Sequence, residues 1–481
     1  MKRLDRRSFL RAAALGGAGI LAAACQPEVV EKIVKETVMV EGEAQVIEKV
    51  VKETVVVEVE KEVAAQPAPQ GPVSVVFARF FGECADEYEG ITEISQGRGE
   101  CGIIQVITNA WNAEHPDQHV ETMVVGWGEH YQRLAAGLAA GETADIAIMH
   151  GAFLPNYAGR GLLFPLDDMV TNTSIDVNDY LPTALDFGSY QNKLYGTPFD
   201  IHTDLWHINA NLWEEAGLVD DDGMPIQPNG MDEFLAAAKA MKDTTGKEFF
   251  TDYYGDIGFR VLFALVRQQG GDVFSPDLET VTFETPEVEA ALSFFEELFG
   301  AGYATRDIED CRKYLLDGEV GSFLNGTWHV DAIDQQLDAG EAAFDRYVVY
   351  PHPLIFDQKA SWANSHMWVL PVQNNPDPAK LDASMAFLEW LYQNNLEWAR
   401  SGHLPVRRSA VDSPEFMAMK HRAEYAEAAD IAVTTPRVPE AEALEQVMRD
   451  EFGAVILGMT SIEEGMANAQ RRLEDFVLMS R

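Results

Sequence analysis

The sequence predicts an α/β protein whose folded part has two lobes. Beyond residue 72, short apolar runs typical of strands alternate with longer segments in which apolar residues recur at helical spacing. Alternation of this kind, with short loops, is typical of a parallel sheet covered by helices on both faces. The chain has 481 residues. About 410 of them follow the N-terminal segments, which is enough for two lobes.

The first elements follow one another directly. Their patterns predict strands and helices in alternation, at residues 73–79, 103–114, 119–125, 129–140 and 145–149. Gly141 is typical of a residue that ends the second helix. Further on, Thr285 and Pro286 are typical of the cap and the first position of another helix, which Gly300 ends. The buried face of that helix is marked by Val288, Leu292, Phe295 and Phe299.

The charge balance excludes one class of partner. The chain carries 78 acidic against 36 basic residues, a net charge of -42, and the first 70 residues carry eleven acidic and ten basic ones. The surplus therefore lies in the folded part. Nucleic-acid binding requires a basic surface, so we expect no nucleic-acid partner.

Residues 1–25 have the organisation of an export signal. A basic start precedes an uncharged stretch, 12–25, that is too short to span a membrane. Residues 6–11 (Arg-Arg-Ser-Phe-Leu-Arg) resemble the twin-arginine export motif, although Asp5 stands where that motif prefers serine. Residues 21–25 resemble a bacterial lipobox, although Ala22 stands at the usual leucine position. We therefore expect lipidation of Cys25 and attachment to the outer face of the bacterial cell membrane; simple secretion is the alternative.

Residues 26–72 are of low complexity. The segment 32–41 recurs seventeen residues later as 49–58, and residues 66–72 have the Pro-rich composition of a linker. The repeat is rich in valine and lacks aromatic residues, so it predicts a flexible stalk between membrane and body. The alternative is a short oligomerising coil, although a period of seventeen is no multiple of a heptad.

Three cysteines remain besides Cys25. Cys84 and Cys101 lie seventeen residues apart in an acidic, glycine-rich segment. In an oxidising compartment they predict a disulfide that contributes about 3 kcal/mol. Cys311 has no evident partner, and we expect it to be a reduced, partly buried thiol.

No signature of catalysis occurs in the sequence. A phosphate-binding loop, a Gly-x-Ser-x-Gly elbow, a His-Glu-x-x-His motif and a Cys-x-x-Cys pair are all missing. We therefore predict no enzyme activity, no cofactor and no metal site. Glycosidases that use two carboxylates leave no short signature, so a carbohydrate-active enzyme is the alternative.

Aromatic, amide and charged residues stand in turn-like places near strand ends. Ligands of α/β proteins bind beyond the carboxyl ends of the strands. Aromatic rings stack on sugar rings, while amides, histidines and carboxylates bond sugar hydroxyls. The candidate ligand-binding residues are Arg79, Trp127, His150, Asp200, His202, Asn325, Trp328, Trp362 and Asn364.

The roles of four tryptophans and of Arg260 leave alternatives open. Trp127 and Trp328 have small or polar neighbours, which favours ligand contact over core packing, whereas Trp213 and Trp390 have the helical spacing of core residues. Arg260 either clamps an anion or pairs with a surface acid.

Several segments, in order along residues 73–470, resemble the extracellular solute-binding proteins of family 1, the maltose-binding type of ABC importer lipoprotein. Residues 195–200 (Tyr-Gly-Thr-Pro-Phe-Asp) and 205–209 (Leu-Trp-His-Ile-Asn) resemble the hinge-crossing segment of that family. Residues 217–218 with 232–234 resemble its next turn and helix, 318–328 its loop ending in tryptophan, and 402–407 its Gly-x-Leu-Pro-Val crossing. Residues 109–116 resemble the end of its first helix.

This resemblance implies a two-lobed periplasmic-binding-protein fold, type II-like, with crossing hinge strands. The first lobe takes residues 73–198 and 352–404, and the second takes 203–350 and 405–481. The implied function is capture of a carbohydrate between the lobes and its delivery to an ABC permease. Trp328, Asp200 and His150 match positions that often contact sugar in the family. The segment from Cys84 to Cys101 is not a general family feature, and we expect it to shape the cleft mouth.

Two other functions stay open at this point. A surface enzyme acting on carbohydrate would convert its ligand, and an adhesion or scaffold lipoprotein would bind no small molecule. Within the binding-protein class, peptides and polyamines are further ligands, and the acidic body favours a neutral or cationic one.

Overall fold

The computed structural model describes residues 29–40, 43–54, 72–306, 308 and 310–480. The chain divides into two units, Met1–Gln70 and Gly71–Arg481. The export motif, the lipobox and Cys25 lie outside the described residues, so their roles stay predictions. In the part of the chain that is described, no helix is both long and apolar enough to cross a membrane.

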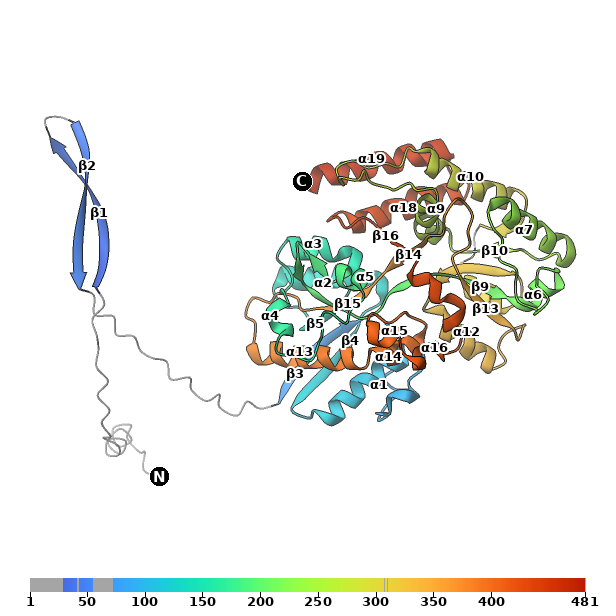
Figure 1. Cartoon of the computed structure of the whole chain (residues 1–481), viewed down its shortest axis with the longest axis horizontal. Coiled ribbons are helices and arrows are strands. Elements are labelled where there is room, and N and C mark those ends of the chain that lie inside the picture. The colour runs from blue at the N-terminus through green and yellow to red at the C-terminus, as the bar shows by residue number, and fades with distance from the viewer. Residues whose placement is uncertain (1–28, 41–42, 55–71, 307, 309, 481) are drawn as a thin grey trace, which may run out of the picture. The chain divides into compact units, whose positions relative to one another are not determined.

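The first unit contains a two-stranded antiparallel sheet (Figure 1). Strand β1 (Val29–Val40) pairs with β2 (Glu43–Thr54), from Val29 opposite Thr54 to Val40 opposite Glu43. The sequence predicted a flexible stalk or a coil here, and the structure has strands instead. The reason lies in the repeat, because its β-branched valines and isoleucines favour extended backbone. Its use as a stalk stays a prediction.

The predicted α/β class is confirmed in the second unit, which has two sheets covered by helices (Figure 1). The first sheet has the order β4-β3-β5-β15-β8. Its strands are β3 (Val73–Arg79), β4 (Gln118–Val124), β5 (Ile146–His150), β8 (Gly196–Pro198) and β15 (His366–Val369). β3 runs parallel to β4 and β5, as predicted, whereas β15 returns from far along the chain and pairs antiparallel with β5 and β8.

The second sheet is built around one long strand, β9, all of whose residues are buried. β12 pairs with one edge of β9, and β13 and β14 share the other edge. The strands are β9 (His202–Asn209), β10 (Phe250–Thr251), β11 (Ala304–Thr305), β12 (Ser322–Gly326), β13 (Tyr347–Pro351), β14 (Ser361–Asn364) and β16 (Ala432–Thr434). A separate two-stranded sheet joins β6 (Ser189–Tyr190) and β7 (Lys193–Leu194).

Helices cover both sheets. In Figure 1, α1 and α13 lie beside β3 and β4, and α18 and α19 lie side by side near α10. Those before β9 or after β15 in the first lobe are α1 (Gly99–Glu114), α2 (Trp127–Ala140), α3 (Leu154–Gly159), α4 (Asp167–Val170), α5 (Pro182–Phe187), α13 (Pro378–Gln393) and α14 (Asn395–Trp398). Those between β9 and β14 are α6 (Ala210–Glu215), α7 (Met231–Thr245), α8 (Tyr254–Asp256), the π-helical turn η4 (Ile257–Val261), α9 (Leu262–Gln268), α10 (Pro286–Gly300), α11 (Cys311–Leu316) and α12 (His329–Asp338). The C-terminal ones are α15 (Arg408–Val411), α16 (Pro414–Met417), α17 (Arg422–Tyr425), α18 (Ala441–Ile456) and α19 (Ile462–Ser480). Short 3-10 turns are η2 (Ile94–Gln96), η3 (Gly151–Phe153), η5 (Ala399–Ser401) and η6 (Ala426–Ala429).

Two apolar cores run along opposite faces of both sheets. On β3, Val75 and Phe77 enter one core and Ala78 the other, and on β9, Leu205 and Trp206 divide in the same way. This division follows from the alternation of side chains along a strand. The core positions predicted on α10 are all buried, and the side chain of its cap Thr285 accepts a hydrogen bond from the Val288 amide.

The tryptophans and cysteines assigned to the interior lie there. Trp213 is fully buried, and Trp390 packs partly buried against the core with its Nε1 3.1 Å from the Ile107 carbonyl oxygen. Cys311 is a buried free thiol, as predicted. The predicted disulfide is also confirmed, because Cys84 and Cys101 are bonded.

Three segments cross between the two sheets. The first joins β8 to β9, and the second is Ser365, between β14 and β15. The third contains Leu404, which pairs with Ile201 of the first crossing.

The predicted lobe boundaries need two corrections. Residues 352–404 were assigned to the first lobe, but β14 pairs with β9 of the second sheet. Residues 405–481 were assigned to the second, but Arg407 bonds Asp179 of the first.

The third crossing depends on a glycine, and this generates a prediction. Gly402 has a φ of 119°, and a β-carbon there would lie 2.0 Å from the Thr327 carbonyl oxygen. Gly402→Ala should therefore lower the free energy of unfolding by about 1–2 kcal/mol for the backbone conformation, and by about 1–3 kcal/mol more for the clash. The matched control is Gly340→Ala, at φ 71° with nothing within 4 Å, which lacks the second effect. Equal urea midpoints for the two variants would contradict the assignment.

The disulfide generates a second prediction. It closes a separation of seventeen residues in the folded body. The double variant Cys84→Ser/Cys101→Ser should lose about 2–4 kcal/mol of stability, because the unfolded chain regains the freedom of that loop. In denaturant titrations, reductant should lower the midpoint of the native protein to that of the double variant and leave the double variant unchanged. An unaltered native midpoint would contradict this.

Candidate ligand-binding site

A cavity of about 440 Å³ lies between the two lobes. The first sheet and its loops contribute Phe80, Phe81, Glu100, Trp127, His150, Phe153 and His366. The second sheet and its helices contribute His202, Tyr253, Asp256, Arg260, Trp328, Trp362, Asn364, Glu445 and Arg449. A ligand in this cavity would therefore contact both lobes at once.

The topology of the parallel strands explains why these residues meet. Phe80 follows β3, His150 ends β5, and Trp328 follows β12. Trp127 begins α2, just after β4, and Tyr253 follows β10. The carboxyl ends of parallel strands share one edge of a sheet, so residues far apart in sequence converge there, as expected for an α/β fold.

Of the nine candidate residues from the sequence, six line the cavity: Trp127, His150, His202, Trp328, Trp362 and Asn364. They differ in exposure. Trp127 is 52% exposed, whereas Trp362 is 5% exposed. Trp127 thus stands at the cavity mouth and Trp362 in its wall.

The other three candidates are buried behind the cavity wall. Arg79 donates to the Gly82 carbonyl oxygen at 2.7 Å and to Gln105 Oε1 at 2.9 Å. Asn325 donates to Asp252 Oδ1 at 3.1 Å and is buried. Asp200 is fully buried as well. The sequence placed all three at strand ends but could not show which way their side chains turn.

Asp200 joins the floor of the cavity to the crossings. Its carboxylate oxygens lie 3.0 Å from His202 Nδ1 and 2.8 Å from His366 Nδ1, and it accepts hydrogen bonds from Trp398 Nε1 and from the His366 amide. Burial alone would raise the pKa of Asp200. The neighbouring His366 and these hydrogen bonds instead hold it well below its usual range, so the group is ionised.

Burial keeps His202, His403 and His150 neutral. Burial, together with the nearby His366, lowers the pKa of His202 to about 4. Burial lowers the pKa of His403 to about 3, although Asp200 opposes the shift. Burial also lowers the pKa of His150 well below its usual value. The His150 ring stacks on Phe80, with the two ring centres 5.3 Å apart. His202 and His403 are therefore neutral imidazoles beside one buried carboxylate.

The second lobe contributes a buried ion-pair network. Arg260 Nη2 lies 2.5 Å from Asp256 Oδ2, and its Nε lies 3.5 Å from Asp204 Oδ1. Arg449 pairs with the other oxygen of Asp256. Although burial raises the pKa of Asp256, the two arginines lower it overall, so Asp256 is ionised. Neither sequence-based role of Arg260 fits alone, because it pairs with one buried acid, Asp204, and one partly buried acid of the cavity wall, Asp256.

Arg260 also lies between two rings of the cavity. Its guanidinium carbon is 5.1 Å from the Trp328 ring centre and 5.3 Å from the Trp362 ring centre. A cation over an aromatic face is attracted to it, so the ion pair helps to orient both tryptophans.

The Cys84–Cys101 segment contributes a group that the sequence did not single out. Glu100 lines the cavity beside the disulfide, and burial raises its pKa to about 7. Two neighbours in the same segment bond α12 of the second lobe. Asp331 accepts from the Gly99 amide at 2.7 Å and from Arg98 at 3.1 Å. The segment therefore both shapes the cavity and bridges the lobes.

Sequence reasoning also missed cavity residues on helical segments or directly before one: Phe153, Tyr253, Asp256, Glu445 and Arg449. A usable signal was the spacing of opposite charges four residues apart, as in Asp256–Arg260 and Glu445–Arg449. That spacing cannot show that two helices, distant in sequence, face one cavity.

Known proteins share both the sequence pattern and the fold. The sequence profile of the family "bacterial extracellular solute-binding protein" matches residues 102–395. A maltotriose-binding protein of Pyrococcus abyssi is 22% identical over 323 residues, which are 66% of this chain and 66% of that protein, so this chain spans slightly less than two thirds of its length. A lactose-binding protein of Rhizobium radiobacter is 23% identical over 65% of this chain and 71% of its own.

Among solved structures, the GacH receptor of Streptomyces glaucescens superposes with a TM-score of 0.71 at 22% identity, over 84% of this chain and 100% of that chain. The sugar-binding protein MalE of Xanthomonas citri gives 0.69 at 20% identity, over 85% and 98%. These likenesses confirm the two-lobed fold. The family profile spans more than half of the sequence, and this agrees with the resemblance of the hinge-crossing segments. The chain therefore belongs to the bacterial extracellular solute-binding protein family.

Proposed function

We propose that this protein binds a carbohydrate in the cavity between its lobes, on the outer side of the cell membrane, and delivers it to an ABC import permease. The observation that carries the proposal is the cavity itself, in which aromatic rings from both lobes surround polar and charged groups. The names of the maltotriose- and lactose-binding relatives point to the same ligand class.

The chemistry of the cavity suits a sugar. The faces of Trp127, Trp328 and Trp362 offer flat apolar surfaces for the C–H face of a pyranose ring. His150, Asn364 and Glu100 offer acceptors and donors for its hydroxyls. The cavity volume of about 440 Å³ lies within the range of about 300–1,000 Å³ typical of small-molecule sites.

Function would then be a shift between an open and a closed arrangement of the lobes. A ligand shifts such an equilibrium only through contacts that differ between the two states. Contacts with Trp127 of the first lobe and Trp328 of the second exist together only when the lobes are closed. The permease would recognise that closed form.

The N-terminal segments complete the proposal. Export by the twin-arginine signal in residues 1–25, lipidation at Cys25 and a stalk formed by residues 26–72 would hold the body at the outer face of the membrane. The description of the family as extracellular supports this location.

Binding is favoured over catalysis on carbohydrate. The family and the relatives named above are binding proteins, and none of the catalytic motifs sought in the sequence is present. A purified polysaccharide or oligosaccharide incubated with the protein should be recovered intact, whereas product formation would favour the enzyme.

The first prediction from this proposal concerns the two facing tryptophans. In a thermal-shift screen, mono- or oligosaccharides should raise the unfolding midpoint, while amino acids, peptides and polyamines should not. Calorimetry with the sugar identified in this screen should show that Trp328→Ala weakens binding by about 2 kcal/mol, which is about 30-fold. Trp127→Ala should weaken it too, and Met459→Ala, an exposed residue outside the cavity, should not. Unchanged affinity in both tryptophan variants would overturn the site.

The second prediction separates the structural role of Arg260 from ligand binding. Arg260→Met leaves Asp204 buried without its cation and leaves Asp256 with Arg449 alone, so we expect a loss of about 3–5 kcal/mol in the free energy of unfolding. Arg346→Met removes an exposed pair with Glu214 and should cost less than about 1 kcal/mol. Denaturant titration without ligand compares the two. Equal losses would show that Arg260 does not hold the wall of the cavity.

A further inference from the structure

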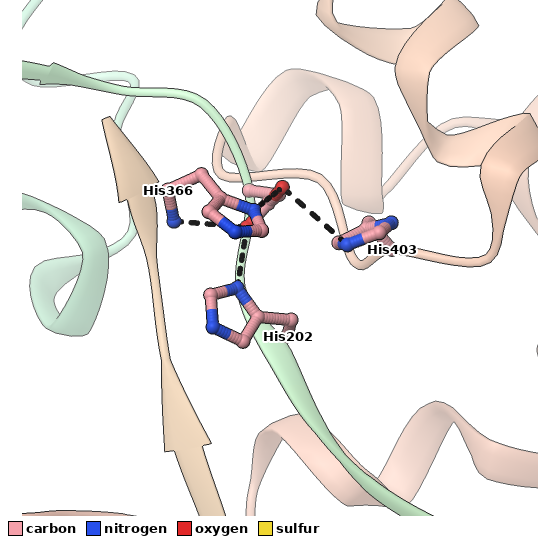
Figure 2. A group of neighbouring side chains, drawn as sticks. His202, His366 and His403 are labelled. Atoms are coloured by element: carbon pink, nitrogen blue, oxygen red, sulfur yellow. Dashed lines mark hydrogen bonds and ion pairs between the residues drawn. The ribbon is translucent and has the colours of Figure 1, made fainter. Parts of the chain in front are cut away.

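Four buried side chains on the cavity floor form a set typical of metal ligands. One ligand atom from each of Asp200, His202, His366 and His403 lies within 4.8 Å of all the others. All four residues are at least 96% buried. In Figure 2, the rings of His202, His366 and His403 surround one carboxylate, and dashed lines join them to it.

The distances suit a tetrahedral ion. Ligand atoms bound to zinc at about 2.0–2.1 Å are about 3.3 Å apart in a tetrahedron. His202 Nδ1 lies 3.0 Å from Asp200 Oδ1, while His366 Nδ1 and His403 Nε2 lie 2.8 and 3.7 Å from Asp200 Oδ2. All four ligand atoms lie within 4.8 Å of one another, so the set must contract somewhat to hold an ion. Small side-chain shifts would therefore bring four donors around one ion.

An unpartnered nitrogen points independently to a cation. The hydroxyl of Ser401 donates to the Trp398 carbonyl oxygen, so at 2.9 Å it accepts from His403 Nδ1. The proton of His403 is therefore on Nδ1, and its Nε2 carries a lone pair. That Nε2 is buried without a hydrogen-bond partner, 3.7 Å from Asp200 Oδ2 and 3.5 Å from Glu100 Oε1.

A lone pair that faces the ionised carboxylate of Asp200 is repelled by it, and a cation between the two would remove that repulsion. Metal-binding histidines typically donate their other N–H to an oxygen, as His403 does to Ser401, and metal-binding carboxylates are themselves hydrogen-bonded. Asp200 meets that second condition through Trp398 Nε1 at 2.8 Å and the His366 amide at 3.0 Å.

We propose that Asp200, His202, His366 and His403 bind one divalent transition-metal ion of the zinc type at the floor of the cavity. Imidazole nitrogens with one carboxylate suit Zn²⁺ and disfavour Mg²⁺ and Ca²⁺, which prefer oxygen ligands. The ligands lie in or directly beside all three crossings: Asp200 and His202 at the first, His366 at the second and His403 at the third. The ion would therefore tie the hinge together beside the ligand.

The sequence predicted no metal site because no short motif holds these residues. Asp200 and His202 are two positions apart, but His366 and His403 follow only after long intervals. The proposal rests on the floor geometry and does not depend on the ligand being a sugar.

The test uses the whole purified protein, stripped with a chelator and then titrated with Zn²⁺ by calorimetry. Excess Mg²⁺ is present throughout to occupy the many surface carboxylates. We expect one Zn²⁺ per chain, a raised unfolding midpoint, and visible absorption typical of four-coordinate Co²⁺ when Co²⁺ replaces Zn²⁺. A Zn²⁺ titration that shows no binding of one ion per chain would overturn the proposal. So would a Co²⁺ spectrum typical of six oxygen ligands.

Matched variants locate the site. His403→Ala should abolish stoichiometric binding, whereas His352→Ala, which removes a buried histidine outside the cluster, should not. Ser401→Ala is milder and should lower the Zn²⁺ affinity by about 10–100-fold, because it removes only the oxygen that orients His403. Ser401→Ala keeps the test decisive if His403→Ala does not fold. Equal Zn²⁺ affinity in the native protein and Ser401→Ala would count against the site.

Discussion

The buried carboxylate of Asp200 is the constraint on which the hinge and the cavity floor depend. An ionised group removed from water is costly unless it is paired and hydrogen-bonded. Asp200 meets this requirement with groups at or beside every crossing: its neighbour His202, the ring and amide of His366, and Trp398, which lies shortly before His403. The three crossings are therefore held in one arrangement by one side chain.

The two walls above this floor differ in character, and the difference suits a binding protein. The first lobe presents mostly rings, among them Phe80 stacked on His150. The second presents rings held by charge, because Arg260 lies between Trp328 and Trp362 while it pairs with Asp256. The ring contacts and the ion pair lie within the second lobe, so that wall is preorganised for a ligand.

Much of the fold could be predicted from local patterns. The strand at residues 73–79 and the helix capped by Thr285 were confirmed because apolar periodicity and capping act over a few residues. The lobe boundaries differ from the prediction, since β14 pairs with the second lobe and Arg407 with the first. Strand partners are set by the whole sheet, which neighbouring residues do not record.

The candidate site divides in the same way. The sequence by itself determined the family, the α/β class, the disulfide and the strand ends near which polar and aromatic residues gather, because these depend on residue type and spacing. Only the tertiary structure decided that Arg79, Asp200 and Asn325 turn inward while Trp127 and Trp328 face the cavity. Only the tertiary structure also brought His366 and His403 to Asp200. The direction of a side chain and its distant neighbours are set by packing between segments, and no local pattern of residues encodes that packing.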